Sequence, residues 1–303
     1  MSIFVFAPGE NWVCDRFVSE WYEHNEEIST LDIEKADTLW LIAGWCWNQI
    51  PLSYLQNKKV ILTVHHIVPE KFNDEKLREF KFRDQFIDIY HVPCEKTKEF
   101  LLHLTYKPIA VIPFWVNQGL WFDISEKESL REKYDIDKDA FIVGSFQRDT
   151  EGHDLKSPKL EKGPDLFCDY VEKLAEEKVS VHVLLAGWRR QYVIKRLDEK
   201  NIPFYYFELP SFTVVNELYN CLDLYVVSSR YEGGPQSIVE CAASKTPIVS
   251  TDVGIARDIL SDKSIFNSSW EASPAPGYAF NSVKKYFLPN SFDKFKNLLS
   301  EKV

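Results

Sequence analysis

The sequence predicts an α/β protein with two domains, each built on a parallel, doubly wound β-sheet. Short continuous apolar runs, typical of strands buried on both faces, alternate with helical stretches along the chain. The alternation pauses near residues 115–124 and then restarts. A length of 303 residues allows one large domain or two of ordinary size, and the restart favours two. We therefore expect two similar folds in tandem.

The first domain is expected to span residues 1–120. Its strands are predicted at residues 3–8, 39–43, 59–64, 87–92 and 109–114. Its helices are predicted at residues 12–24, 51–57, 74–86 and 95–104. Because strands and helices alternate, the strands should lie parallel to one another.

The second domain is expected to span residues 121–280. It opens with a helix at residues 125–134, for which Ser125 and Glu128 have the spacing of a capping box. Its strands are predicted at residues 141–146, 181–186, 204–207, 222–227 and 247–250. Its further helices are predicted at residues 162–177, 191–201 and 214–220, with another after residue 235.

One stretch of the second domain joins two strands through a glycine-containing turn and a helix. The turn contains Glu232, Gly233, Gly234 and Pro235, and the helix carries Glu240. Glycines let a ligand approach the backbone, and a proline suits the first helical turn. The free N–H groups of such a turn favour phosphate. The stretch therefore suits a ligand with hydroxyls and phosphate, such as a nucleotide sugar, although a buried helix start with two incidental glutamates is the alternative.

The stretch resembles the E-x7-E signature of retaining nucleotide-sugar glycosyltransferases with the GT-B fold, glycosyltransferase family 4 in particular. The match is EGGPQSIVE at residues 232–240, where Gly234-Pro235 replaces the family's more common Phe-Gly. The resemblance implies two Rossmann-like domains facing a central cleft, with the acceptor bound by the N-terminal one and the nucleotide sugar by the C-terminal one. Residues 281–303 would form a helical tail, of which residues 292–299 cross back to the first domain.

The resemblance also implies which residues bind the donor. Arg148 and Lys162 match the two cations that clasp the donor diphosphate, and such cations lower the barrier by binding charge that develops as the sugar bond breaks. Glu232 should touch the sugar hydroxyls near the reacting carbon, and Glu240 the ribose hydroxyls. The remaining donor-binding residues surround the helix start and are Gly233, Gly234, Pro235, Gln236 and Ser237. The polar segment 149–161 between the cations is predicted to be either a flap over the phosphates or a surface loop.

A histidine pair follows the third strand, at the end of an α/β sheet where ligands bind. Family 4 enzymes often place a histidine there near the donor sugar, and His65 matches it better than His66. Glu232 and His65 are therefore assigned to catalysis. The residues assigned to the acceptor side are Gly9, Asn11, Trp12, His66 and Trp115. Trp45 and Trp47 also lie near predicted strand ends and suit sugar rings, with core packing as the alternative for each tryptophan.

The composition limits the partners. A net charge of −10 argues against nucleic acid, and the longest apolar run, residues 38–47, is far below the ~20 residues of a membrane span. The basic and aromatic segment 71–83 fits a solvated helix face, or contact with an anionic bilayer. Six cysteines without a C-x-x-C pair indicate free thiols, no zinc site and a reducing, cytoplasmic compartment. No basic leader precedes the first strand.

The sequence thus predicts retaining transfer of a sugar from a nucleotide-diphosphate sugar to a hydroxyl of a glycan, glycolipid or glycoprotein. No metal and no cofactor are expected, because Arg148 and Lys162 supply the positive charge. Two alternatives stay open. A sugar-nucleotide epimerase of the same fold would consume donor without an acceptor, and a non-catalytic nucleotide-sugar binder would bind without turnover.

Overall fold

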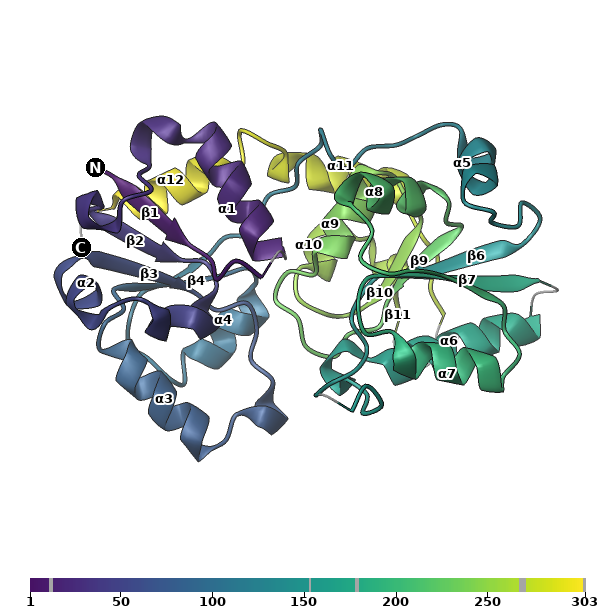
Figure 1. Cartoon of the computed structure of the whole chain (residues 1–303), viewed down its shortest axis with the longest axis horizontal. Coiled ribbons are helices and arrows are strands. Elements are labelled where there is room, and N and C mark those ends of the chain that lie inside the picture. Colours follow the sequence, from purple (N-terminus) through teal and green to yellow (C-terminus); the bar gives the residue numbers. More distant parts are fainter. Residues whose placement is uncertain (11–12, 153, 178–179, 267–270, 302–303) are drawn as a thin grey trace. The chain divides into compact units, whose positions relative to one another are not determined.

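The computed structural model describes residues 1–10, 13–152, 154–177, 180–266 and 271–301. Its contacts divide the chain into two units, the first formed by Met1–Phe114 with Pro289–Val303, and the second by Trp115–Leu288. Each unit contains one parallel β-sheet flanked by helices (Figure 1). The sequence placed the junction near residue 120 and the start of the tail at residue 281. The contacts place the junction after Phe114 and the return to the first unit at Pro289.

The first unit has a five-stranded sheet in the order β1-β2-β3-β4-β5. The strands are β1 (Ile3–Phe6), β2 (Thr38–Leu41), β3 (Lys59–Thr63), β4 (Ile89–Val92) and β5 (Ile109–Val111). A parallel bridge between Ile3 and Ser29 extends the sheet beyond β1, and the Thr30 N–H donates to the Ile3 carbonyl at 2.9 Å. After β1 and α1, the chain passes along the outer edge of β1 at Ser29. It then forms β2, which pairs with the opposite edge of β1. Such a reversal is what makes a sheet doubly wound.

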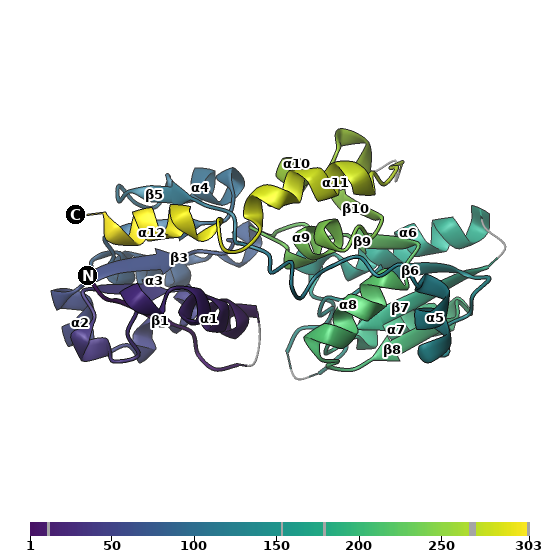
Figure 2. The same cartoon turned by 90° about the horizontal axis from the view of Figure 1, so that it is seen from above.

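Helices cover both faces of this sheet. They are α1 (Val13–His24), α2 (Leu52–Asn57), α3 (Asp74–Asp84), α4 (Glu95–Leu101) and α12 (Phe292–Ser300), with short 3₁₀ helices η1 (Glu26–Ile28), η2 (Ile33–Lys35), η3 (Gly44–Gln49) and η4 (Pro69–Lys71). The Trp40 ring of β2 lies 5.5 Å from Trp21 of α1 and 5.1 Å from Phe295 of α12. Figure 2 shows α12, in yellow, against this sheet. The last helix thus packs in the first unit through aromatic side chains.

The second unit has a six-stranded sheet in the order β11-β10-β9-β6-β7-β8. The strands are β6 (Phe141–Ser145), β7 (Val181–Ala186), β8 (Phe204–Phe207), β9 (Leu224–Val227), β10 (Ile248–Thr251) and β11 (Ile265–Phe266). Renumbered from the first strand of the unit, this is the Rossmann order, and its topological switch point lies between β6 and β9. Ligands of open α/β sheets bind beyond the carboxyl ends of the strands at such a point.

The helices of the second unit also cover both faces of its sheet. They are α5 (Lys127–Lys133), α6 (Pro164–Glu177), α7 (Gln191–Glu199), α8 (Phe212–Asn220), α9 (Gln236–Ala243), α10 (Ala256–Ile259) and α11 (Pro276–Val283), with η5 (Leu160–Lys162), η6 (Asp262–Ser264) and η7 (Lys284–Tyr286). Helices α6 and α7 share an apolar core with β6, β7 and β9, whereas α8 and α9 lie on the opposite face (Figure 1). The doubly wound, GT-B architecture predicted from the sequence is therefore confirmed.

Three local predictions were wrong. Helix α5 begins at Lys127 after Glu126, and the Ser125 hydroxyl donates to the Glu126 carboxylate at 2.9 Å, so the expected capping box does not form. Pro235 is the residue before α9 (φ −57°, ψ 113°) rather than part of its first turn. The second predicted strand, residues 39–43, ends two residues early at Leu41, and a bend at residues 42–43 leads into η3.

Candidate functional site

The polar residues after β6 and β9 meet at the switch point of the second unit. Gln147 follows β6, and Ser229 and Glu232 follow β9. The Ser229 hydroxyl lies 3.2 Å from Gln147 Oε1 and 3.4 Å from Glu232 Oε1. Two loops that are 82 residues apart in sequence are thus joined through one hydroxyl.

Lys162 comes to the same place from η5. Its Nζ contacts Glu232 Oε1, and the two side chains are only 20% and 12% exposed. The Lys162 carbonyl accepts a hydrogen bond of 2.8 Å from Gln147 Nε2. The structure therefore brings together one predicted diphosphate cation and the predicted sugar-binding acid, in a largely desolvated ion pair.

The close approach behind Lys162 requires a glycine. Gly163 has φ +61°, and a Cβ at this residue would lie 1.9 Å from the Ser228 carbonyl oxygen. An L side chain would be strained by that backbone conformation and would also collide with fixed backbone. Gly163 thus lets the Lys162 loop lie directly against the loop that leaves β9.

The turn before α9 is supported in the same way. Gly254 has φ +51°, and a Cβ there would lie 2.2 Å from the Gly233 carbonyl oxygen. Gly233 itself is buried, whereas Gly234 is half-exposed beside the start of α9. Gln236 and Ser237, which open the helix, are also half-buried. The predicted phosphate-facing helix start is present and partly open.

Glu240 lies inside α9 and is 7% exposed. Its Oε2 accepts a hydrogen bond of 3.0 Å from the hydroxyl of Tyr219 on α8. Burial, followed by the negative charge of Glu240, raises the pKa of Tyr219 well above its ordinary value, so this phenol stays protonated and remains a donor. Tyr219 therefore fixes the carboxylate that is predicted to bind ribose.

Arg148 follows β6 beside a buried ion pair. Its Nε donates to the Thr150 carbonyl at 2.9 Å. The next residue, Asp149, pairs with the fully buried Arg190 at 3.1 Å, and burial raises the pKa of Asp149 while Arg190 opposes that shift. Arg190 also donates to the carbonyls of Ser145 and Ala186. One arginine thus joins the ends of β6 and β7 where Arg148 leaves the sheet.

The segment 149–161 is a hairpin-like loop, of which residue 153 lies outside the described part. An antiparallel bridge joins Thr150 to Pro158, and the Glu151 N–H donates to the Ser157 carbonyl at 2.9 Å. Asp154 accepts hydrogen bonds from Lys156 and Ser157, which lower its pKa to about 2. Whether this loop closes over a donor stays a prediction.

The predicted catalytic histidine is placed by the first unit. His65 follows β3, is half-buried, and its Nε2 lies 2.8 Å from the Ile42 carbonyl. Its ring stacks on Phe114 with centroids 5.4 Å apart and contacts Trp45 at 5.5 Å. His66, beside it, is also half-buried. An exposed aromatic face at Trp45, which is 52% exposed, therefore lies next to His65.

Other residues predicted for the acceptor side differ in their surroundings. Gly9 is exposed with φ +73°, and its N–H donates to Asp15 Oδ1 at 3.0 Å. Asn11 and Trp12 lie outside the described residues. Trp115 and Trp47 are 0% and 6% exposed. The core-packing alternative therefore describes these two tryptophans, and in this structure neither ring offers an open face to a sugar.

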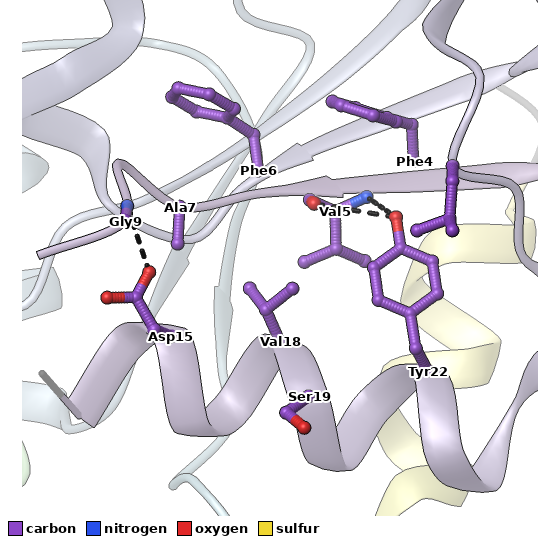
Figure 3. Close-up of a pocket in the computed structure, with 10 residues that line it drawn as sticks. Phe4, Val5, Phe6, Ala7, Gly9, Asp15, Val18, Ser19 and Tyr22 are labelled. Carbon is purple, nitrogen blue, oxygen red and sulfur yellow. Dashed lines mark hydrogen bonds between the residues drawn. The ribbon is translucent and has the colours of Figure 1, made fainter. Parts of the chain in front are cut away.

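A pocket lies beside Gly9 in the first unit. It has a volume of about 380 Å³ and is bounded by β1 and α1. Figure 3 shows Val18 and Tyr22 of α1 facing β1, with the Tyr22 hydroxyl at the Val5 backbone. The Val5 N–H donates to that hydroxyl at 3.0 Å. Tyr22 therefore supplies a hydrogen-bond partner to β1 at the edge where Ser29 bridges only Ile3. The pocket wall is largely apolar.

Within the described residues, no group of three or more His, Cys, Asp or Glu side chains could hold a metal ion. The short run Asp135–Asp139 contains two pairs of aspartates spaced two residues apart, and paired carboxylates can bind a divalent ion. The run precedes β6 and so lies at the amino end of that strand, away from the switch point. Asp137 there accepts a hydrogen bond of 2.8 Å from the Asp139 N–H. All six cysteines are buried and free.

Sequence reasoning missed several residues of this site. Gln147 and Ser229 join the loops, Tyr219 fixes Glu240, and Gly254 supports the Gly233 turn. Gln147 and Ser229 lie next to predicted strand ends and could have been found by that position. No local signal marks Tyr219 or Gly254, because their partners are distant in sequence.

The comparisons with known proteins support the same class of fold. The family model described as "Glycosyl transferases group 1" matches residues 155–270, which carry Lys162, Glu232 and Glu240. The curated alpha-galactosylglucosyldiacylglycerol synthase of Streptococcus pneumoniae (strain ATCC BAA-255 / R6) is 26% identical over 165 residues. That match covers 50% of this chain and only 40% of the relative.

Solved structures show the fold over the whole chain. The crystal structure of Anabaena HepE in complex with UDP and glucose matches with a TM-score of 0.73 and 13% identity, and the match covers 99% of both chains. Sucrose-phosphate synthase from Thermosynechococcus elongatus matches with a TM-score of 0.63 and 15% identity, over 97% of this chain and 76% of that chain. The chain is thus a GT-B protein with a region similar to glycosyl transferases of group 1.

Among the described helices, none combines the length and the apolar character that crossing a membrane requires.

Proposed function

We propose that this chain is a retaining glycosyltransferase of the family 4 type. It transfers a sugar from a nucleotide-diphosphate sugar to an acceptor hydroxyl. The second unit binds the donor, with Arg148 and Lys162 on the diphosphate, the start of α9 on the distal phosphate, and Glu240 on the ribose. Glu232 and His65 orient the sugar.

The meeting of Lys162 and Glu232 at the switch point is the observation that carries this proposal. A cation and an acid that are 70 residues apart touch at the carboxyl end of the sheet, where α/β folds bind ligands. The similarity of residues 155–270 to glycosyl transferases of group 1 supports the same assignment. A carboxylate that binds hydroxyls beside a cation that binds phosphate matches a nucleotide sugar.

The reaction exchanges one bond at the anomeric carbon for another on the same face. The bond from that carbon to the diphosphate oxygen breaks, and the bond to the acceptor oxygen forms. The departing diphosphate takes the acceptor's proton, while Arg148 and Lys162 stabilise its developing charge. These two side chains do the work that a metal ion would do, so we propose a metal-independent reaction.

The acceptor is proposed to be a glycan, glycolipid or glycoprotein hydroxyl. The name of the Streptococcus relative makes a glycosyl diacylglycerol the first acceptor to try. Six buried, free thiols agree with the proposed cytoplasmic location, where thiols stay reduced.

Glu232→Ala separates the proposed roles. Nucleotide sugars based on UDP, GDP, ADP, CDP and dTDP are incubated with and without candidate acceptors, and release of the nucleoside diphosphate is measured. The proposal expects turnover to fall at least about a hundredfold in Glu232→Ala, while nucleoside diphosphate binding is retained. Full activity of this variant, or donor consumption in which no sugar reaches an acceptor or water, contradicts it. Nuclear magnetic resonance of the product reports whether the anomeric configuration is retained.

A further inference from the structure

Two ion pairs of opposite polarity join the same two segments of the second unit. We call these the lysine segment, residues 160–165, and the glutamate segment, residues 228–232. Lys162 of the lysine segment contacts Glu232. In the reverse sense, Arg230 of the glutamate segment contacts Asp165, with Arg230 Nη2 2.6 Å from Asp165 Oδ2. The first pair involves two predicted donor-binding residues, whereas nothing assigns a function to the second.

The Arg230–Asp165 pair has the geometry of a strong interaction. Arg230 Nη1 lies 2.8 Å from Asp165 Oδ1, so both nitrogens of the fork meet both oxygens of the carboxylate. Bidentate pairs of this kind fix orientation as well as distance. The side chains are 35% and 26% exposed, so solvent screens the pair only in part.

Backbone contacts set the same register between the segments. The N–H groups of Arg230 and Tyr231 both donate to the Glu161 carbonyl, at 2.8 and 3.1 Å. Arg230 Nη1 also donates to the Leu160 carbonyl at 2.9 Å. Gly163 lies directly against the Ser228 carbonyl, so the two segments are in contact from Ser228 to Glu232.

A donor diphosphate competes with this arrangement at one point. In the proposed function its phosphates bind the Lys162 ammonium and the sugar hydroxyls bind the Glu232 carboxylate, so donor binding would pull the Lys162–Glu232 pair apart. The Arg230–Asp165 pair makes no predicted contact with the donor and is not drawn into that exchange.

We propose that Arg230 and Asp165 are positioning residues of the donor site, which keep the lysine and glutamate segments in register when a diphosphate takes Lys162 away from Glu232. This inference rests on the proposed function. Without the pair, the two segments would lose their register and would have to be ordered when the diphosphate binds. The free energy of that ordering would be subtracted from the free energy of binding, so the affinity would fall. Because an arginine fork is required, Arg230→Lys should retain the charge but not the full effect.

The test is a double-mutant cycle on the full chain. Asp165→Asn, Arg230→Gln, the double variant and Arg230→Lys are titrated calorimetrically with the nucleoside diphosphate that stabilises the wild type most among UDP, GDP, ADP, CDP and dTDP. Asp123→Asn is the matched control, since Asp123 pairs with Lys245 at 2.8 Å in the same unit, outside both segments. Circular dichroism and melting temperature establish that each variant is folded.

The proposal expects each single variant to bind the nucleoside diphosphate about tenfold more weakly, and the double variant to bind no more weakly than either single one. Arg230→Lys should lie between Arg230→Gln and the wild type, and Asp123→Asn should bind as the wild type does. Wild-type affinity in the folded single variants, or losses that add in the double variant, would overturn the positioning role. If no nucleoside diphosphate binds the wild type, the proposed function fails instead.

Discussion

The two units carry related sheets but fix their predicted functional residues by different interactions. In the second unit, ion pairs and hydrogen bonds between loops place Lys162, Glu232 and Glu240. In the first unit, aromatic contacts and a backbone carbonyl place His65. A polar network can exchange partners with a polar ligand, whereas a stacked ring is held in place whether or not a ligand is present. From this difference we predict that the proposed donor side exchanges partners when a ligand binds, whereas the surroundings of His65 stay fixed.

A buried chain of hydrogen bonds illustrates the fixed character of the first unit. Trp40 Nε1 donates to Thr63 Oγ1 at 3.0 Å, and Thr63 Oγ1 lies 2.9 Å from His91 Nδ1. His91 Nε2 lies 2.7 Å from the Ile112 carbonyl. The network joins strands β2, β3 and β4 to the residue after β5, inside a cluster of aromatic rings. Every one of these polar groups is satisfied, so the core specifies one packing.

The largest expected effect separates two glycines with similar backbones. Gly163→Ala should destabilise the second unit by about 3 kcal/mol or more, because a Cβ would collide with the Ser228 carbonyl and the backbone is left-handed. Chemical denaturation measures this change. Gly152→Ala is the control, because Gly152 has φ +58° and a Cβ added there would meet nothing within 4 Å, and it should cost about 1 kcal/mol. Equal losses in the two variants would show that the segments are not in close contact.

The pH dependence should single out the first unit. Burial lowers the pKa of His91 to about 3, against the opposing hydrogen bond to Ile112. The unfolded chain binds this proton near pH 6.5, whereas the folded chain binds it only near pH 3. Between these values the unfolded state holds more protons, so stability is lost as pH falls from about 6.5 towards 3. Hydrogen exchange read by mass spectrometry, from about pH 7 to about pH 4.5, should show the loss of protection in peptides of β3, β4 and β5.

Asp223 of the second unit provides the contrast. Burial raises its pKa, but hydrogen bonds from Lys127, the Ile142 N–H and Arg131 outweigh burial and lower it overall. Its stabilising effect is therefore complete above the ordinary aspartate pKa and is lost only at lower pH. The His91→Gln variant tests the assignment to His91. It should be less stable than the wild type at neutral pH, and its free energy of unfolding should fall less steeply between about pH 6.5 and about pH 4.5, because it lacks the His91 proton. An unchanged slope in this variant would contradict the assignment.

The smallest expected effect concerns exchange of partners at the donor site. Glu232→Gln removes the charge that holds Lys162, so a nucleoside diphosphate no longer has to displace it. We expect binding of the nucleoside diphosphate, measured by calorimetry, to become about threefold tighter. The gain is modest because a partly buried ion pair competes only weakly with the diphosphate for Lys162. Glu176→Gln on the exposed end of α6 is the matched control and should bind as the wild type does. Weaker binding in Glu232→Gln would mean that the ion pair does not compete with phosphate.

The sequence was informative wherever local pattern decides structure. Strands β3 and β7 were found within one residue of their ends, because strands buried on both faces form continuous apolar runs. Trp45 and Trp47 show where such reasoning stops. In a strand, residues two apart share a face, but η3 has about three residues per turn and turns them apart. One ring is therefore exposed and the other buried.

Residues of the candidate site could be proposed from the sequence, but their arrangement could not. Motif spacing located Lys162, Glu232 and Glu240. It could not locate the Lys162–Glu232 contact, the Tyr219–Glu240 hydrogen bond or the seat of Gly163 on Ser228, because each depends on how distant segments pack. The bridge between Ile3 and Ser29 could not be predicted either, because a single bridging residue leaves no periodic pattern in the sequence.

Hydrogen exchange in the presence of a nucleoside diphosphate tests the central claim most directly. The full chain is compared with and without the diphosphate that stabilises it most, and protection is read for each peptide. We predict that added protection concentrates in the second unit, in peptides covering residues 144–149, 160–166 and 228–240. Binding that protects other peptides and leaves these three unchanged would contradict a donor site at the switch point between β6 and β9.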